Sequence, residues 1–434
     1  MGAIRSGPRA VPAPGPARPG PEMAWPVWWL TFVSLTCLNL SIGLGSVLLV
    51  GFLGSWLMYV LAWPARSLDQ MLRTLLPWAF PLLALASVLW SQAPMTTFRL
   101  AAELLLVTGF GIVMARAQPM RSFVSAFMCM MLTSVLVGTV LGRSSTIGMT
   151  NETALIGIFG SKNNFAMMVS FMLLAAVAVL PDPRQPRILR LVALLCCLLA
   201  PPYMVLTKSV GGIITLGIAL AAFGVFALAA RLSARARPGF YAGILLLACC
   251  GFGVFLLLED SGILEEVLRS FGKDTSLTGR TFLWQRAAEL IGLNPLLGVG
   301  YQAFWVQESV EAEGLWRLGK NTARSGFHLH SLYYATAVEL GYVGVAVLGT
   351  TLVTLTLSVL VNACRRPSLE LAFGAAVVVI FASRAFVELD FISPFNIGTL
   401  LIPILWGYGT QQPAAVFRPV LRRPPPGLRT LAAG

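Results

Sequence analysis

The most constraining feature of this sequence is a succession of long apolar runs separated by short polar connections. An α-helix needs about 20 apolar residues to cross the hydrocarbon core of a membrane, where its backbone must satisfy its own hydrogen bonds. Runs of suitable length lie near residues 26–43, 45–63, 75–91, 100–115, 123–141, 164–180, 189–206, 210–229, 240–258, 332–362, 368–387 and 394–410. The sequence therefore predicts an all-α, polytopic membrane protein with about twelve transmembrane helices.

The composition agrees with this prediction. Hydrophobic residues make up 57% of the chain and charged residues only 11%, whereas about a quarter of the residues in soluble domains are charged. The apolar surface is therefore suited to lipid, which excludes a soluble enzyme. The 7 cysteines lie in or beside apolar runs without the spacing of a metal site, so we interpret them as small core residues.

Lysine and arginine in the short loops predict the orientation of the helices, because cytoplasmic loops carry an excess of both. Every second loop is rich in arginine, and both termini belong to the same set. This set holds most of the 31 basic residues but few of the 18 acidic ones. We therefore predict that both termini lie in the cytoplasm. The net charge of +13 is then a topology signal, and no nucleic-acid partner is expected.

Five regions follow from this topology. We predict a disordered basic cytoplasmic tail (1–24), transmembrane helices 1–9 (25–258), a large extracytoplasmic loop (259–331), transmembrane helices 10–12 (332–410) and a basic cytoplasmic tail (411–434). The loop is the one long polar segment between predicted spans. Chemistry outside the cytoplasm is therefore expected in this loop.

Inside the loop, a helical pattern opens within residues 273–284, where Ser276 or Thr278 can cap it, and should end at the Asn294-Pro295 pair. Arg280 and Trp284 are four residues apart and therefore share a helix face. An arginine at a helix N-terminus is suited to bind an anion, because the guanidinium and the free N–H groups point the same way. The alternative is a capped surface helix with a solvated arginine.

The chain has only 2 histidines, His328 and His330, at the end of the loop. Side chains two residues apart on a helix point about 200° apart, so at most one would face a given site unless the segment is unwound. A zinc site needs three or four ligands and no further histidine is present, so we predict no metal site. A lone imidazole is better suited to proton transfer near neutral pH. The alternative is an interfacial pair beside aromatic residues.

Several motifs, each weak alone, together resemble a known family. In the loop these are Leu277-Thr-Gly-Arg280-Thr-x-x-Trp284, Pro295-Leu-Leu-Gly298-x-Gly300-x-x-x-Phe304-Trp305 and His328-x-His330-Ser-x-Tyr333-x-x-x-x-Glu339-Leu-Gly341-x-x-Gly344. Upstream segments are Gly157-Ile-Phe159-Gly-Ser-Lys162-Asn163 and Thr207-Lys208-Ser209. In this order on such a scaffold, they resemble the O-antigen ligase and polymerase superfamily, most closely the exopolysaccharide polymerases of succinoglycan type.

Two residues depart from the family pattern. The family usually shows His-Asn where this chain has His330-Ser331, so an amide that positions the imidazole or sugar is missing. The family often has arginine where this chain has Lys208, and an ammonium cannot give the bidentate grip of a guanidinium on phosphate.

The resemblance implies a GT-C-like, metal-independent, inverting glycosyltransferase of a bacterial inner membrane, with its active site on the periplasmic side. The implied donor is a polyprenyl-diphosphate-linked oligosaccharide, and no cofactor is implied. Cationic side chains can stabilise the leaving diphosphate without a metal. His330 is the implied base for the acceptor hydroxyl, His328 serves instead or holds the acceptor, and Arg280 acts on the diphosphate. The candidate diphosphate-binding residues, all expected on the outer side, are Lys208, Lys162, Arg280, Arg99 and Arg143. A chain-length regulator is a further candidate partner.

Other polar groups in or near the spans are interpreted as structural. Arg384 has Glu388 four residues further on, which favours an ion pair over catalysis. Glu103 and Asp390 are further candidates to pair with the basic residues.

We predict that the protein polymerises lipid-diphosphate-linked repeats into exopolysaccharide or O-antigen-type glycan outside the cytoplasm. One alternative is a ligase that moves finished glycan to a lipid A-core acceptor. Another is a polysaccharide or lipid transporter, which would also need many spans. Transporters concentrate polar groups mid-membrane, whereas the polar groups here collect in one outer loop. An assembly partner without catalysis is the last alternative.

Overall fold

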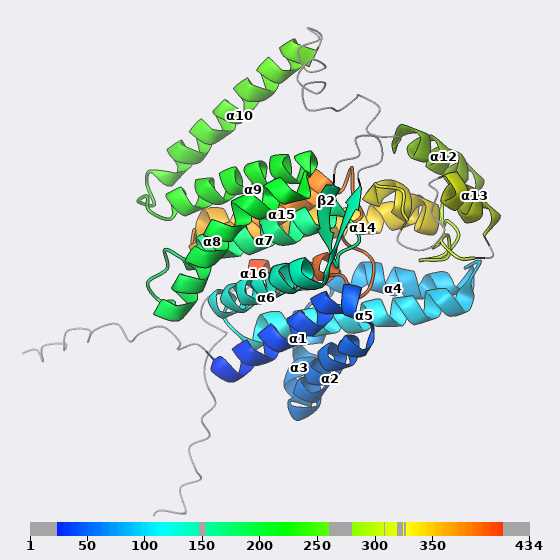
Figure 1. The fold of residues 1–434 in the computed structure, drawn as a ribbon, viewed down its shortest axis with the longest axis horizontal. Helices are drawn as coiled ribbons and strands as arrows, with labels where there is room; N and C mark the ends of the chain where they lie inside the picture. Colours follow the sequence, from blue (N-terminus) through cyan, green and yellow to red (C-terminus); the bar gives the residue numbers. More distant parts are fainter. Residues whose placement is uncertain are drawn as a thin grey trace, which may run out of the picture.

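The computed structural model describes residues 24–146, 153–259, 280–307, 309–318, 324 and 327–410, and these are almost entirely helical (Figure 1). The elements before residue 180 are α1 (Trp25–Leu44), α2 (Val47–Ala62), α3 (Pro64–Leu72), η1 (Leu76–Trp78), α4 (Ala79–Ala86), η2 (Ser87–Leu89), α5 (Pro94–Ala117), α6 (Met120–Leu141), β1 (Arg143–Thr146), β2 (Thr153–Gly157) and α7 (Lys162–Val179). The later elements are α8 (Arg187–Thr207), α9 (Val210–Ala229), α10 (Arg237–Glu259), α12 (Arg280–Leu293), α13 (Val310–Leu318), α14 (Leu332–Arg365), α15 (Leu369–Arg384) and α16 (Ile397–Thr410).

The predicted all-α, polytopic membrane fold is confirmed. In the described residues, 8 helices are long and apolar enough to cross a membrane: α1, α5, α6, α7, α8, α9, α10 and α14. The α2–α3 pair, bent by 102°, raises the number to 9 if it is one span. The remaining predicted spans correspond to helices of fewer than about 18 residues, namely the η1–α4–η2 segment, α15 and α16. The predicted count of twelve is therefore not confirmed.

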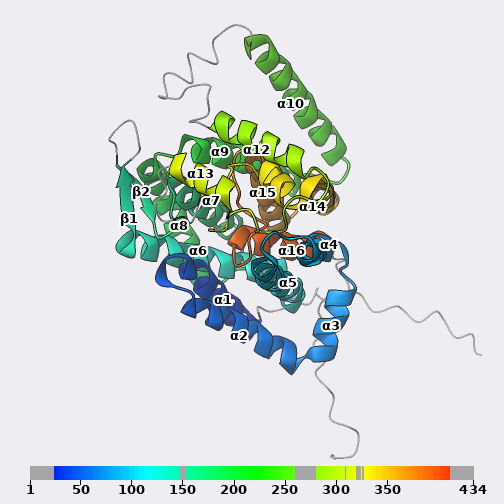
Figure 2. The ribbon, with the colours of Figure 1, turned by 90° about the vertical axis from the view of Figure 1, so that its right-hand side faces the viewer.

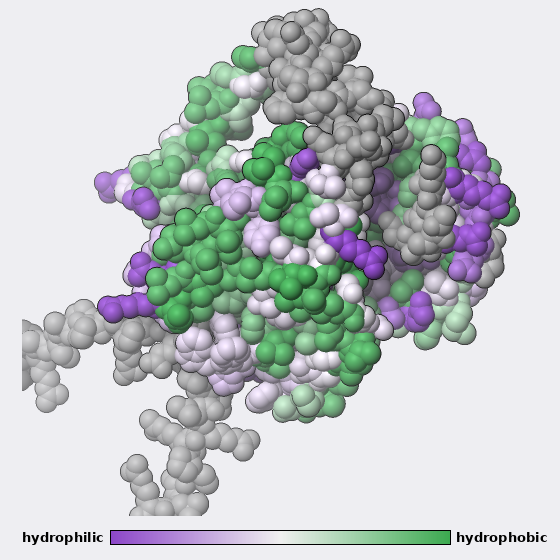
Figure 3. Space-filling model, in the orientation of Figure 1, coloured by the Kyte–Doolittle hydropathy of each residue, from purple (hydrophilic) through white to green (hydrophobic). Residues whose placement is uncertain are grey.

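The interior of the bundle is packed with aromatic and small side chains from α6, α7 and α15. Phe127 of α6 lies against Phe171 of α7 and Phe373 of α15, with ring centroids 6.0 Å and 5.8 Å away. By contrast, α10 stands away from the bundle and is exposed along its length (Figure 2). The surface in Figure 3 is broadly hydrophobic over the helices and hydrophilic around α12 and α13. This distribution fits a lipid-facing bundle with a polar assembly at one end.

The short loops gather at two ends of the bundle, and α5 runs between them. Near the last turn of α5, the carbonyl of Arg116 accepts a hydrogen bond from Arg66 at 3.4 Å. At the first turn, the Thr97 hydroxyl donates to the carbonyl of Tyr301 at 2.8 Å. We call the first end the arginine end and the second the motif end. The arginine end collects loops that were predicted to share one side, and the motif end carries α12 and α13 (Figure 1).

A small β-hairpin at the motif end was not predicted. Strands β1 and β2 pair antiparallel between α6 and α7. Gly157 ends β2 with a left-handed φ of 57°, and a Cβ there would lie 2.6 Å from the ring of Phe165. The hairpin therefore brings the chain tightly into α7, whose first residue is Lys162.

Two of the glycine motifs interlock at a break in α14. Gly341 has φ 63° and ψ −165°, which interrupts the helix after a short leading segment. The carbonyl of Glu339, freed from the helix ladder by this break, accepts a hydrogen bond from the N–H of Gly300 at 2.8 Å. A Cβ on Gly298 would lie 2.4 Å from the Glu339 backbone. The glycines therefore dock residues 295–300 onto α14, and their role is structural.

Candidate active site

The motif segments meet at one buried carboxylate, that of Glu388. Its Oε1 accepts hydrogen bonds from Arg280 at 2.7 Å and from the Asn163 amide at 2.8 Å. Its Oε2 lies 3.5 Å from Nδ1 of His330. Segments up to 225 residues away in the sequence therefore contact this one side chain. The Glu388 side chain is only 7% exposed, so these contacts are made largely away from water.

The Asn163 contact depends on the starts of two helices. Ser161 caps α7 by accepting the N–H of Asn164 at 3.1 Å, and Asn163 follows in its first turn. Ser209 caps α9 and also donates its hydroxyl to the Asn163 Oδ1 at 2.8 Å. Lys208, between α8 and α9, adopts the left-handed conformation expected of a turn. The two upstream motifs are therefore the N-terminal caps that hold Asn163 against Glu388.

The two histidines lie in extended and turn backbone, and not on a helix. α14 begins only at Leu332, and His330 has a left-handed φ of 50°. The two imidazole centroids are 4.2 Å apart, so the expectation that the rings point apart is wrong. The physical reason is the turn at His330, whose backbone N–H donates to Nδ1 of His328 at 3.1 Å. Both rings therefore face one site.

Neighbouring elements fix the position of this segment. The N–H of Leu332 donates to the carbonyl of Ala385 at 2.9 Å, which joins the histidines to the Glu388 loop. Trp284 of α12 donates its indole N–H to the carbonyl of Leu329 at 3.0 Å. The prediction that Arg280 and Trp284 share a helix face is confirmed, because both point toward this assembly. α12 also ends at Leu293, as the Asn294-Pro295 pair predicted.

The predicted pairing of Arg384 with Glu388 is wrong. Arg384 forms a two-pronged ion pair with Asp390, and its Nη2 lies 2.9 Å from Asp390 Oδ1. Both side chains are almost fully buried. Glu388 has turned toward Arg280 because the chain leaves the helix after Arg384 and its backbone closes a turn onto the Arg384 carbonyl. The buried pair anchors the loop and leaves Glu388 available to the site.

The surroundings set the charges of Glu388 and His328. Burial opposes ionisation of Glu388, but contact with His330 and the charges of Arg280 and Arg384 outweigh it and lower its pKa to about 2. Burial, together with the charges of His330 and Arg280, lowers the pKa of His328 to about 4. At neutral pH the site therefore holds an ionised Glu388 and a neutral His328, whose Nδ1 accepts a hydrogen bond as found.

Acid should destabilise the protein in two steps. A pKa below its unfolded value means that the folded state binds fewer protons, so stability is lost as the pH falls. For His328 the loss should run from about pH 6.5 down to about 4, and for Glu388 from about 4.5 to about 2. The midpoint temperature of thermal unfolding, measured in detergent between pH 7.5 and 4.5, should fall less steeply with decreasing pH in His328→Gln than in the wild-type protein. An unchanged slope in that variant would contradict this assignment.

The other predicted cations lie at different distances from the cluster. Lys162 Nζ donates to the carbonyl of Lys208 at 3.3 Å, so these two residues are neighbours beside Asn163. Arg99 on α5 and Arg143 on β1 are exposed. Within the described chain, neither is hydrogen-bonded or ion-paired to Glu388, Arg280 or the histidines. The structure therefore brings together Arg280, His328 and His330, with Lys162 and Lys208 near them.

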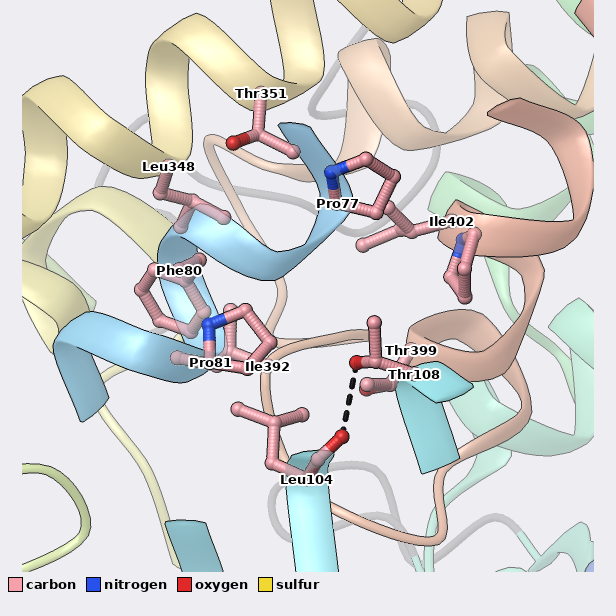
Figure 4. A pocket seen from close by; sticks show the side chains of 11 residues that line it. Pro77, Phe80, Pro81, Leu104, Thr108, Leu348, Thr351, Ile392, Thr399 and Ile402 are labelled. Atoms are coloured by element: carbon pink, nitrogen blue, oxygen red, sulfur yellow. Dashed lines mark hydrogen bonds between the residues drawn. The ribbon is translucent and has the colours of Figure 1, made fainter. Parts of the chain in front are cut away.

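An apolar pocket lies within the helices, and none of its lining residues belongs to the charged cluster (Figure 4). Its lining residues are Pro77, Phe80, Pro81, Leu104, Thr108, Leu348, Thr351, Ile392, Thr399, Ile402 and Pro403. The Thr108 hydroxyl is already used by the Leu104 carbonyl at 2.8 Å. This pocket offers no charged group, so it is no candidate for diphosphate chemistry.

Comparison with known proteins supports the resemblance found in the motifs. The O-antigen ligase family matches residues 191–349. This range includes Lys208, Arg280 and both histidines, but not Asn163 or Glu388. A similar protein is the exopolysaccharide production protein ExoQ of Rhizobium meliloti (strain 1021), which is 28% identical over 391 residues. The aligned region covers 89% of this chain and 88% of that relative.

These two matches cover different lengths of the chain, and both are to proteins described by polysaccharide functions. The family match spans the part of the chain that carries the loop motifs, and the relative aligns over nearly all of the membrane scaffold. Together with the helical architecture, they confirm the resemblance: the chain is a multi-span membrane protein that is similar to proteins of the O-antigen ligase and polymerase superfamily.

Proposed function

We propose that this protein is an inverting glycosyltransferase that polymerises polyprenyl-diphosphate-linked oligosaccharide repeats. The observation that carries the proposal is the convergence of His330, Arg280 and Glu388 in one site at the motif end. A base, an orienting carboxylate and a cation are the groups that transfer from a diphosphate donor requires. The name of the similar exopolysaccharide production protein agrees with a role in making a polymer.

The proposed reaction is a single displacement. Nε2 of His330 takes the proton of the acceptor hydroxyl while that oxygen attacks the anomeric carbon of the donor. The bond from the anomeric carbon to the diphosphate oxygen breaks, and the diphosphate leaves as an anion. Glu388 beside Nδ1 orients the imidazole and stabilises the imidazolium that forms, and Arg280 stabilises the leaving group. Attack from the opposite face inverts the anomeric configuration.

Arg280 can serve both Glu388 and the diphosphate. A guanidinium has five N–H donors, and the contact with Glu388 uses Nη2 only. Lys162 and Lys208 supply further positive charge beside Asn163. The positive charges of Arg280 and the two lysines together exceed the negative charge of Glu388, so the site attracts a diphosphate. Residues 259–331 would then be the catalytic loop, and Arg99 and Arg143 would act on more distant parts of the donor.

The proposed orientation places the motif end outside the cytoplasm of a bacterial inner membrane. It is supported by the contacts that join the arginine-rich loops at the other end. Reporter fusions after Arg237 and after Arg366 should give a cytoplasmic signal, and a fusion within residues 300–320 should give an extracytoplasmic one. A cytoplasmic signal from residues 300–320 would overturn the orientation, because the lipid-linked donor would meet the wrong face.

The proposed activity can be tested with purified protein in liposomes that contain a polyprenyl-diphosphate-linked repeat. We expect a ladder of lengthening glycan that forms without added metal and persists in excess EDTA, because protein cations stabilise the diphosphate. Activity that EDTA abolishes and Mg²⁺ or Mn²⁺ restores would remove this argument.

A ligase is the second candidate, favoured by the description of the family that matches residues 191–349. Addition of a lipid A-core acceptor distinguishes the two reactions. A polymerase should lengthen the donor-linked glycan with or without this acceptor. Transfer to the acceptor with no lengthening in its absence would identify a ligase and refute polymerisation. A chain-length regulator, if it acts on this protein, should narrow the ladder when it is included.

A further inference from the structure

The cluster of His328, His330 and Glu388 has the donor atoms of a metal site as well as those of a proton relay. One donor atom from each residue lies within 4.8 Å of the other two. The sequence argument against zinc counted only histidines and overlooked a carboxylate as the third ligand. Zinc binds imidazole nitrogen and carboxylate oxygen, often with three protein ligands and a water molecule.

The spacing of two donor atoms fits a shared cation. Two ligands of a tetrahedral zinc ion, with bonds of about 2.0–2.1 Å, lie roughly 3.3–3.5 Å apart. His330 Nδ1 and Glu388 Oε2 are 3.5 Å apart. Nδ1 is buried and has no hydrogen-bond partner among the residues that the structure describes. Arg280 and Asn163 both use the other carboxylate oxygen, Oε1. The two atoms therefore face each other, and a cation can bind between them once the Nδ1 proton is lost.

The third ligand needs only a small movement. A ring nitrogen of His328 within 4.8 Å would have to approach by roughly 1–1.5 Å to complete a zinc-sized triangle. His328 lies in non-helical backbone, and its ring already packs beside that of His330. Rotation of one side chain can therefore close the site without moving a helix.

We infer that this cluster binds zinc or a similar divalent cation, and that the bound cation inhibits glycan transfer. The inhibitory part rests on the proposed function, in which Nε2 of His330 accepts the acceptor proton. A metal on Nδ1 requires that nitrogen to be deprotonated, so the remaining ring proton must sit on Nε2. The imidazole is then held in the tautomer that cannot act as a base.

Arg280 gives this site a property that can be tested. Its guanidinium lies 2.7 Å from Glu388 Oε1, and its positive charge opposes a cation bound to Oε2. Removal of the Arg280 charge should therefore tighten metal binding, although the same change should impair transfer. A cation held by unrelated surface groups would not respond to Arg280 in this way.

The test is a Co²⁺ titration of the full-length purified protein after metals have been removed. Tetrahedral cobalt has a visible absorption band, and Zn²⁺ should displace it one for one. His328→Ala and Glu388→Gln should each weaken Co²⁺ binding by about 10- to 100-fold or more, because each removes a ligand. Arg280→Gln should tighten it by roughly tenfold or more. Glu311→Gln, which alters an exposed carboxylate paired with Arg286, is the matched control and should bind as wild type.

Two outcomes would overturn the site: no cobalt band in the wild-type protein, or a band that neither His328→Ala nor Glu388→Gln weakens. In the transfer assay, Zn²⁺ should inhibit and EDTA should restore activity. Zn²⁺ that activates the metal-free protein would overturn the inhibitory role. The titration uses no substrate, so its failure leaves the proposed transfer intact. Conversely, metal binding by a protein that transfers no glycan would refute the proposed function and with it the inhibitory role, but not the metal site.

Discussion

His330→Ala should lower glycan transfer by on the order of 10²–10⁴-fold while binding of the lipid-linked donor survives. The imidazole is assigned to the acceptor proton, so its loss affects the reaction step and not the grip on the diphosphate. The measurements are glycan length on a gel in cells, transfer by purified protein, and donor binding by each variant, with expression checked. Loss of donor binding together with activity would contradict the assignment of His330 as the base.

His328→Ala is the matched comparison within the same segment. The two rings lie side by side, and Nδ1 of His328 accepts a hydrogen bond from the backbone N–H of His330 at 3.1 Å. We therefore expect a clear loss from His328→Ala, but a smaller one than from His330→Ala, because the base itself remains. If His330→Ala keeps normal polymer while His328→Ala abolishes it, the two roles must be exchanged.

Glu388→Gln tests the proposed orienting role of Glu388 more directly than truncation of its side chain to alanine. An amide keeps the shape of the carboxylate and can still accept from Arg280, but it no longer stabilises the imidazolium. The kcat of transfer should fall while binding of the lipid-linked donor is retained, because the imidazole loses the carboxylate that orients it. A purely structural Glu388 would lower the amount of folded protein without changing the kcat of the folded fraction.

The helices of the scaffold were predicted well because helix formation and helix ends depend on residues that are close in the sequence. The apolar runs gave the positions of the helices, and the Asn294-Pro295 pair gave the end of α12. The rings of His328 and His330 were misplaced because the prediction assumed a helix. Only the left-handed turn at His330 brings them together, and a histidine is too weak a signal of that conformation to predict it from the sequence.

Glu388 was missed as part of the site for a related reason. Its partner Arg280 is 108 residues away, whereas Arg384 offered an obvious partner at helical spacing. One signal in the sequence does point to it. Once the eleventh span is oriented, Glu388 and Asp390 must emerge on the same side as Arg280 and the histidines. Two acidic residues on the same side of the membrane as a basic loop are expected to form ion pairs with its basic side chains.

Arg280→Ala should cost roughly 2–4 kcal/mol of transition-state stabilisation, or about 30- to 1000-fold in rate. The guanidinium contact with the diphosphate strengthens as the anomeric bond breaks, so its removal affects the transition state most. Arg280→Lys should recover only part of the rate, because one ammonium replaces a planar fork. Arg286→Ala, on the same helix but paired with Glu289 and Glu311 at the surface, should remain close to wild type.

Arg280→Ala should also lower stability, and this effect must be separated from the effect on catalysis. Arg280→Ala leaves the buried Glu388 carboxylate without its cation, which destabilises the site even without substrate. The double variant Arg280→Ala with Glu388→Gln removes this unpaired charge. If Arg280 acts on the diphosphate, the double variant should regain stability but not activity. Recovery of transfer to the level of Glu388→Gln alone would mean that Arg280 only supports Glu388, and the leaving group would then depend on Lys162 and Lys208.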